Sequence, residues 1–154
     1  MPRVGADASV KAPGAAVRRV TAAALLCLVA CTQDGDGPAR VVWDRDVCKA
    51  CSMVISDRHF AAQVRGGPKN AVAKFDDLGC MMKWLDQQPW ADEPATRIWV
   101  TRQQDGEWLD GRTARYVSGR TSPMGFNFGA VDPGAEGNDF AAQRAAVRAF
   151  ATKR

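Results

Sequence analysis

The stretch Asn70-Ala-Val-Ala-Lys-Phe-Asp-Asp-Leu-Gly-Cys-Met-Met-Lys-Trp-Leu85 carries two patterns, one typical of a strand and one typical of a helix. Residues 70–75 form a short run with β-branched and aromatic side chains, which predicts a strand. Asp76 and Asp77 follow and suit the cap and acidic first turn of a helix. Beyond them apolar side chains recur at helical spacing, at Leu78, Met81, Met82 and Leu85. We therefore expect a helix that ends at about Gln88 and buries both of its methionines.

The segment before this stretch completes a strand–turn–strand–helix unit. Residues 59–64 have the composition of a first strand. Gly66-Gly-Pro68 is a turn signal, so the strand at 70–75 can return beside the first as a hairpin. Together with the helix, these elements predict a β-β-α unit within residues 41–90.

A second unit with a similar order follows. Its expected elements are a strand at 95–102, a turn at 104–106, strand-like pieces at 107–110 and 113–117, and a helix at 140–151 capped by Asn138 and Asp139. Residues 122–129 are punctuated by glycine and indicate a loop. The predicted fold class is α+β, with two small related halves of ββα(β) type that each contain antiparallel strands and one helix. The halves would occupy about residues 41–90 and 95–154.

Length and charge limit the classes of protein to which the chain can belong. With 154 residues, it has room for one ordinary domain or two very small ones. Its formal net charge is +4, but without residues 1–30 the chain holds 17 Lys and Arg against 16 Asp and Glu. Because a phosphate-binding surface needs a clear basic excess, we expect no nucleic-acid partner.

Residues 1–30 have the pattern of an export signal. A charged Val17-Arg-Arg-Val20 precedes an apolar run over residues 20–30, which is too short to span a bilayer. The run ends in Leu28-Val-Ala-Cys31, which looks like a bacterial lipobox. That resemblance implies that residues 1–30 are a lipoprotein signal peptide and that lipid on Cys31 anchors the protein to a membrane outside the cytoplasm. The alternative is a soluble secreted protein.

The residues after Cys31 bear on the tether and on the choice of membrane. Residues 31–40 are rich in glycine and aspartate and would form a flexible tether, with the ordered domain over residues 41–154. Thr32 directly follows Cys31, whereas the common inner-membrane retention signal has Asp at that place. We therefore expect a periplasm-facing lipoprotein, and the outer membrane is favoured over the inner membrane.

The segment Cys48-Lys-Ala-Cys-Ser-Met53 brings two thiols and a thioether together in the sequence. Such soft donors select Cu(I), Zn or Fe–S among biological metals, and the thioether favours Cu(I) over Zn(II). In a strand-like segment Cys51 and Met53 would point the same way and could converge on one ion. Two other interpretations remain open, a disulfide between Cys48 and Cys51 and plain packing.

Four separated motifs stand in order along the chain. They are Cys48-Lys-Ala-Cys-Ser-Met53 with His59-Phe-Ala-Ala-Gln63; Phe75-Asp-Asp-Leu-Gly-Cys-Met-Met82 with Trp84-Leu85; Trp99-Val-Thr101 with Trp108-Leu-Asp110 and Tyr116-Val117; and Ser122-Pro-Met-Gly125. Together they resemble the NosL family of lipoprotein copper chaperones over about residues 44–130. The resemblance implies two related α+β halves. It also implies a protein without enzymatic activity that delivers Cu(I) for the assembly of nitrous-oxide reductase or another cuproenzyme.

The resemblance also implies a set of ligands and partners. It assigns Cu(I) binding to Cys48, Cys51 and Met53, and it adds Met124 as a further thioether. Ser52 stands where many family members have glycine, which matters only if the position needs a positive φ. The implied partners are the copper-receiving apo-enzyme and, as a further candidate, its membrane transporter machinery.

Other ligands and functions remain as alternatives. His59, the single histidine, is a reserve ligand, although a lone histidine on a strand is more often structural. Cys80 lies off the centre of the apolar stripe of its helix and is expected in boundary packing. One alternative function is a thiol–disulfide oxidoreductase that uses Cys48 and Cys51. The other is a structural zinc module formed by those two cysteines with Cys80 and His59.

Overall fold

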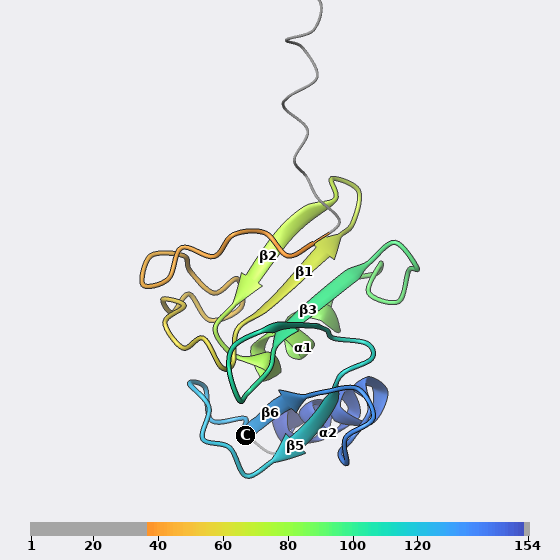
Figure 1. The fold of residues 1–154 in the computed structure, drawn as a ribbon. Helices are drawn as coiled ribbons and strands as arrows, with labels where there is room; N and C mark the ends of the chain where they lie inside the picture. Colours follow the sequence, from red (N-terminus) through yellow and green to blue (C-terminus); the bar gives the residue numbers. More distant parts are fainter. Residues whose placement is uncertain (1–36, 153–154) are drawn as a thin grey trace, which may run out of the picture. The chain divides into compact units, whose positions relative to one another are not determined.

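The computed structural model describes residues 37–152 (Figure 1). The predicted signal peptide, Cys31 and most of the predicted tether lie outside the described residues. The elements are β1 (Ala62–Gly66), β2 (Ala71–Phe75), α1 (Leu78–Leu85), β3 (Arg97–Thr101), β4 (Trp108–Asp110), β5 (Arg115–Ser118), β6 (Phe128–Val131) and α2 (Phe140–Thr152). Two antiparallel sheets and two helices confirm the predicted α+β fold class.

The larger sheet has the strand order β2-β1-β3-β4, and all of its strand pairs are antiparallel. Strand β1 lies inside this sheet, with Val64 opposite Ala73 of β2 and Ile98 of β3. Val64 and Ile98 are buried, and helix α1 packs against β1 and β2. The sheet thus joins the predicted hairpin to two strands that follow α1 in the sequence (Figure 1).

Helix α1 begins at the predicted cap. The carboxylate of Asp77 accepts a hydrogen bond from the backbone N–H of Gly79 at 2.8 Å. The predicted core positions of the helix are all fully buried, namely Leu78, Met81, Met82 and Leu85. The helix ends at Leu85 rather than at about Gln88, and residues 86–88 continue as hydrogen-bonded turns. The apolar periodicity therefore predicts the position and the buried face of the helix correctly, but it places the end of the helix too late in the sequence.

Strands β5 and β6 form a second, two-stranded sheet. Strand β6 corrects the prediction of a loop over residues 122–129, because the strand begins at Phe128. The strand is short and contains Gly129, which hides its pattern in the sequence. A Cβ at Gly129 would lie 2.6 Å from the side chain of Gln103, so close packing explains the glycine.

Helix α2 packs against both β5 and α1. It is capped as predicted, since the carboxylate of Asp139 accepts a hydrogen bond from the backbone N–H of Ala142 at 2.8 Å. Arg144 and Arg148 of this helix form ion pairs with Asp86, which follows α1. Buried apolar contacts and these ion pairs together fix the second helix on the first.

Side chains of β1 and β2 fasten the segment 39–46 to the sheet. Gln63 is fully buried, and its amide accepts from the backbone N–H of Ala39 at 2.9 Å and donates to the carbonyl oxygen of Ala39 at 2.8 Å. The ammonium group of Lys74 donates to the carbonyl oxygen of Arg40 at 2.6 Å and to Asp46 at 2.7 Å. The chain is therefore fixed directly before the cysteine segment.

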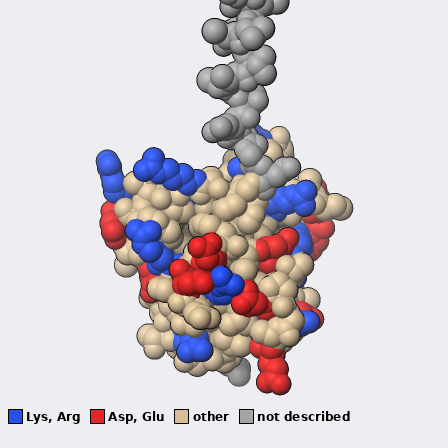
Figure 2. Space-filling model, in the orientation of Figure 1, with Lys and Arg blue, Asp and Glu red and all other residues tan. Residues whose placement is uncertain are grey.

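Charged side chains of both signs are interspersed on the face shown in Figure 2. Among the ion pairs of the described residues, Arg102 contacts Asp105 at 2.8 Å and Asp132 at 2.6 Å. Neither helix within residues 37–152 combines the length and the apolar character that crossing a membrane would require.

Candidate metal centre

The predicted copper-binding segment forms a tight loop before β1. The residues that flank it, Val47 and Val54, pair as an isolated antiparallel bridge, and the backbone N–H of Cys48 donates to the carbonyl oxygen of Met53 at 2.8 Å. The backbone N–H of Lys49 donates to the carbonyl oxygen of Lys74 at 2.8 Å, which holds the loop against strand β2. The loop therefore places its cysteines beside the junction of β2 and α1.

Four side chains with metal-binding atoms meet at this junction. The thiols of Cys48, Cys51 and Cys80 and a carboxylate oxygen of Asp76 all lie within 4.8 Å of one another. Metal–thiolate bonds of about 2.3 Å place two ligand sulfurs at most about 4.6 Å apart, so small adjustments would let one ion bind. All three cysteines are free thiols. Cys51 is half-buried and the other three side chains are buried, an arrangement that suits a soft metal ion.

The thiols and the carboxyl group of the cluster are largely buried and shift one another's pKa values. The thiol of Cys51 donates a hydrogen bond to Asp76 at 3.3 Å. A hydrogen bond from Cys80 lowers the pKa of Cys48, and the same contact, together with burial, raises the pKa of Cys80. Burial raises the pKa of Cys51 and raises the pKa of Asp76 to about 6. Cys48 therefore ionises most readily, and a bound cation would favour deprotonation of its neighbours.

The sequence singles out two members of this cluster as copper ligands and misses the other two. Cys80, expected in boundary packing, faces the cysteine loop from the first turn of α1. Asp76, expected as part of the helix cap, instead accepts the hydrogen bond from Cys51, and Asp77 caps the helix. Their spacing in the sequence gave little signal, because Asp76 precedes the extended cap residue Asp77 and lies outside the helix, so helical periodicity does not relate it to Cys80.

Met124 reaches the same region from a separate loop. The carboxylate of Asp77 accepts hydrogen bonds from the Ser122 hydroxyl at 2.7 Å and from the backbone N–H of Met124 at 2.9 Å. These bonds hold residues 122–125 against the start of α1, and Met124 lines one surface pocket together with Cys51 and Cys80. Met124 thus lies beside the cluster, and its role as a ligand stays a prediction.

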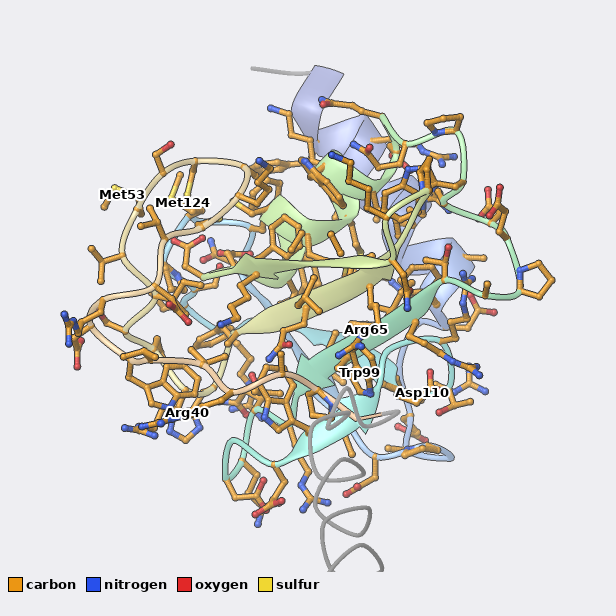
Figure 3. All side chains as sticks on the ribbon, turned by 90° about the horizontal axis from the view of Figure 1, so that it is seen from above. Arg40, Met53, Arg65, Trp99, Asp110 and Met124 are labelled. Carbon is orange, nitrogen blue, oxygen red and sulfur yellow. The ribbon has the colours of Figure 1, made fainter. Side chains whose placement is uncertain are left out.

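Met53 lies at the end of the cysteine loop and is 56% exposed. Residues 51–53 form no strand, and Ser52 has a φ of +64°. The strand alternation used to argue that Cys51 and Met53 point the same way therefore does not apply. In Figure 3 the labelled side chains of Met53 and Met124 lie toward the same side of the domain. Ligation by Met53 also stays a prediction.

His59 is not part of the cluster. Its exposed ring has Nδ1 2.9 Å from the carbonyl oxygen of Gln103, and it lines a different pocket, together with Arg120. The structure therefore brings the three cysteines of the predicted zinc module together and leaves its histidine elsewhere.

Sequence comparison agrees with the resemblance carried by the motifs. The family profile described as NosL matches residues 39–151, which is more than half of the chain and includes every member of the cluster. A search of curated proteins gave no match to the chain. On the strength of the profile match, the chain belongs to the NosL family.

Proposed function

We propose that the protein is a Cu(I) chaperone, without enzymatic activity, that carries its ion in the cluster of Cys48, Cys51, Asp76 and Cys80. The observation that carries the proposal is the convergence of three free thiols within 4.8 Å. Thiolates are soft ligands and select ions such as Cu(I). Membership of the NosL family, whose proteins are copper-binding accessory proteins, supports copper over other soft metals.

The unequal burial of the thiols supports transfer of the ion rather than permanent storage. Cys48 and Cys80 are 3% and 5% exposed, whereas Cys51 is half-buried. Cys51 and Cys80 both line the surface pocket, and Cys51 is the more exposed of the two. An incoming ligand can therefore approach copper at Cys51 while the deeper thiols retain it. The thioether of Met124 beside the cluster would add a weak ligand that is easily displaced.

A structural zinc site is the second candidate, because three thiols and one carboxylate also satisfy tetrahedral Zn(II). The nearby thioether of Met124 favours Cu(I), since zinc makes little use of such ligands. A thiol–disulfide oxidoreductase is less favoured. Cys48 and Cys51 lie in a loop, whereas redox motifs of this spacing gain a low thiol pKa at a helix N-terminus.

Anaerobic Cu(I) titration against a competing chelator tests the proposal. We expect stoichiometric binding, and we expect lower affinity after Cys48→Ser, Cys51→Ser or Cys80→Ser. His59→Ala is the matched control, because His59 lies outside the cluster and should leave the affinity unchanged. Equal Cu(I) affinities in wild type and Cys51→Ser would contradict the proposal. Zinc bound to the purified protein that Cu(I) cannot displace would contradict it as well.

We further propose that the protein works as a periplasm-facing lipoprotein, with the outer membrane favoured over the inner membrane. The support is the Leu28-Val-Ala-Cys31 motif followed by Thr32. The proposed partners are the copper-receiving apo-enzyme, which is nitrous-oxide reductase or another cuproenzyme, and its membrane transporter machinery.

Lipid labelling tests the anchor. Cys31→Ser should abolish incorporation of labelled lipid and release the protein from membranes, because Cys31 closes the lipobox-like motif. Cys27→Ser is the control, since Cys27 lies within the apolar run and should leave labelling intact. Persistent labelling of the Cys31→Ser variant would refute the anchor.

A further inference from the structure

The surface pocket beside the metal cluster has a positively charged rim. Lys49 of the cysteine loop and Lys83 of helix α1 line it, and no Asp or Glu is among its lining residues. Both lysines are exposed, and neither forms an ion pair with any residue between 37 and 152. Two unpaired ammonium groups at one opening favour an anionic ligand.

The walls of the pocket suit a small organic molecule. Trp84 and Phe126 contribute aromatic surface, and Gln87 contributes an amide that can donate and accept hydrogen bonds. Phe126 is fixed against α1, since a Cβ at Gly79 would lie 2.1 Å from its ring. Apolar walls with a few polar groups are the usual composition of small-molecule sites.

The pocket leads to the metal cluster. Cys51 and Cys80 line it, whereas Cys48 and Asp76 do not. Cys80 is only 5% exposed, so a small ligand reaches it more readily than a side chain on the surface of a folded partner. A ligand in the pocket would therefore have its charged groups near the two lysines and its metal-binding atom near the two cysteines.

We propose that this pocket receives Cu(I) as an anionic complex with a small thiol that carries carboxylate groups. The inference rests on the proposed Cu(I) chaperone function and adds the form in which copper arrives. A Cu(I) ion held by two thiolates has a net negative charge, and carboxylates on the thiol increase it. Lys49 and Lys83 would bind those carboxylates, whereas a small thiol without carboxylates would lack this contact.

Two ligand exchanges would move the ion without any change of oxidation state. In the first, a bond forms between copper and the Cys51 sulfur, the bond to one small thiolate breaks, and the Cys51 proton leaves on the departing thiol. In the second, Cys80 replaces the other small thiolate in the same way. Copper starts and ends as Cu(I) bound by two thiolates, and two neutral thiol groups are released.

Stopped-flow transfer from two copper donors tests the inference on the full chain. The donors are the Cu(I) complexes of glutathione, which carries carboxylates, and of 2-mercaptoethanol, which carries none. Tryptophan fluorescence reports arrival, because Trp84 lines the pocket. We expect Lys49→Gln and Lys83→Gln each to slow transfer from the glutathione complex about threefold, and the double variant about tenfold, with the effect weakening at high salt.

Two controls separate charge in the pocket from other effects. Transfer from the 2-mercaptoethanol complex, which has a smaller negative charge and no carboxylates, should be slowed much less than transfer from the glutathione complex in every variant. Lys69→Gln removes an exposed lysine outside the pocket lining and should alter neither rate. Unchanged transfer from the glutathione complex in the double variant, or equal slowing with both donors, would overturn the inference. Chelator titration of the wild type separates failure of the pocket inference from failure of the chaperone proposal. A wild type that binds Cu(I) but transfers it independently of the lysines refutes only the pocket inference, whereas a wild type that binds no Cu(I) refutes both proposals.

Discussion

Replacing Asp77 with Asn should loosen the loop that carries Met124. The Asp77 carboxylate accepts three hydrogen bonds, from the backbone N–H of Gly79 at 2.8 Å, from the Ser122 hydroxyl at 2.7 Å and from the backbone N–H of Met124 at 2.9 Å. Asn offers one oxygen and one NH2 group. Whichever way the amide is turned, its NH2 group faces a backbone N–H that cannot accept a hydrogen bond.

The size of the effect follows from two opposing terms. A hydrogen bond to a charged group contributes about 1.5–3 kcal/mol, and one or two of the three would be lost. Burial raises the pKa of Asp77, so the neutral amide recovers part of the cost of desolvating the carboxylate. The hydrogen-bond term is larger, and we expect Asp77→Asn to lower the free energy of unfolding by about 2 kcal/mol.

Urea unfolding of the metal-free protein measures this loss, and chelator titration measures the effect on copper. Cu(I) affinity should fall as well, because the loop would no longer hold Met124 beside the cluster. Asp139→Asn is the matched control, since Asp139 caps α2 through one exposed hydrogen bond and should cost less than about 0.5 kcal/mol. Equal unfolding free energies for the two variants would refute the reasoning.

Three further predictions test the site and the fold. Met124→Leu should weaken Cu(I) binding about ten- to a hundredfold, or about 1–3 kcal/mol, whereas Met81→Leu in the core should leave it unchanged. Chelator titration measures both affinities, and the reverse result would mean that Met81 rather than Met124 supplies the thioether. Ser52→Gly should raise the free energy of unfolding in urea by about 0.5–1 kcal/mol, because Ser52 has a φ of +64°, and a decrease would contradict this. Burial raises the pKa of Asp86, but hydrogen bonds from Arg148 and Arg144 outweigh burial and lower the pKa below its usual value. The stabilisation by Asp86 is therefore complete above its unfolded pKa of about 3.9 and is lost as the pH falls through its folded pKa. Asp86→Asn should flatten the dependence of unfolding free energy on pH below about 4, and parallel curves for variant and wild type would exclude the effect.

The part of the fold that the sequence predicts best is the unit of β1, β2 and α1. Its strand and helix patterns are contiguous, and the buried residues Met81 and Met82 fall where the helical spacing places them. Strand β6 escaped prediction because four residues that include Gly129 carry too little pattern, and its stability comes from pairing with β5. Local periodicity cannot report a strand whose stabilising contacts are all distant in sequence.

The candidate site could be predicted only in part for the same reason. Cys48 and Cys51 stand out because they are close in sequence. The pattern of the helix alone predicts only a packing role for Cys80, because the cysteines that it meets lie in a separate segment. The position of Met124 depends on a hydrogen bond from Ser122 to Asp77, across 45 residues. A resemblance to a family could suggest Met124, but only the folded chain shows which carboxylate holds its loop.

The fastening of segment 39–46 has a mechanical consequence. A pulling force applied at the N-terminal side of the described chain would reach Ala39 first, where two hydrogen bonds to the buried amide of Gln63 resist it. Lys74 provides a second point of resistance through Arg40 and Asp46. Both points precede the cysteine loop, so tension would be borne by the sheet before it could deform the loop. A force applied on the N-terminal side of Ala39 would therefore leave the thiol geometry undisturbed until these contacts break.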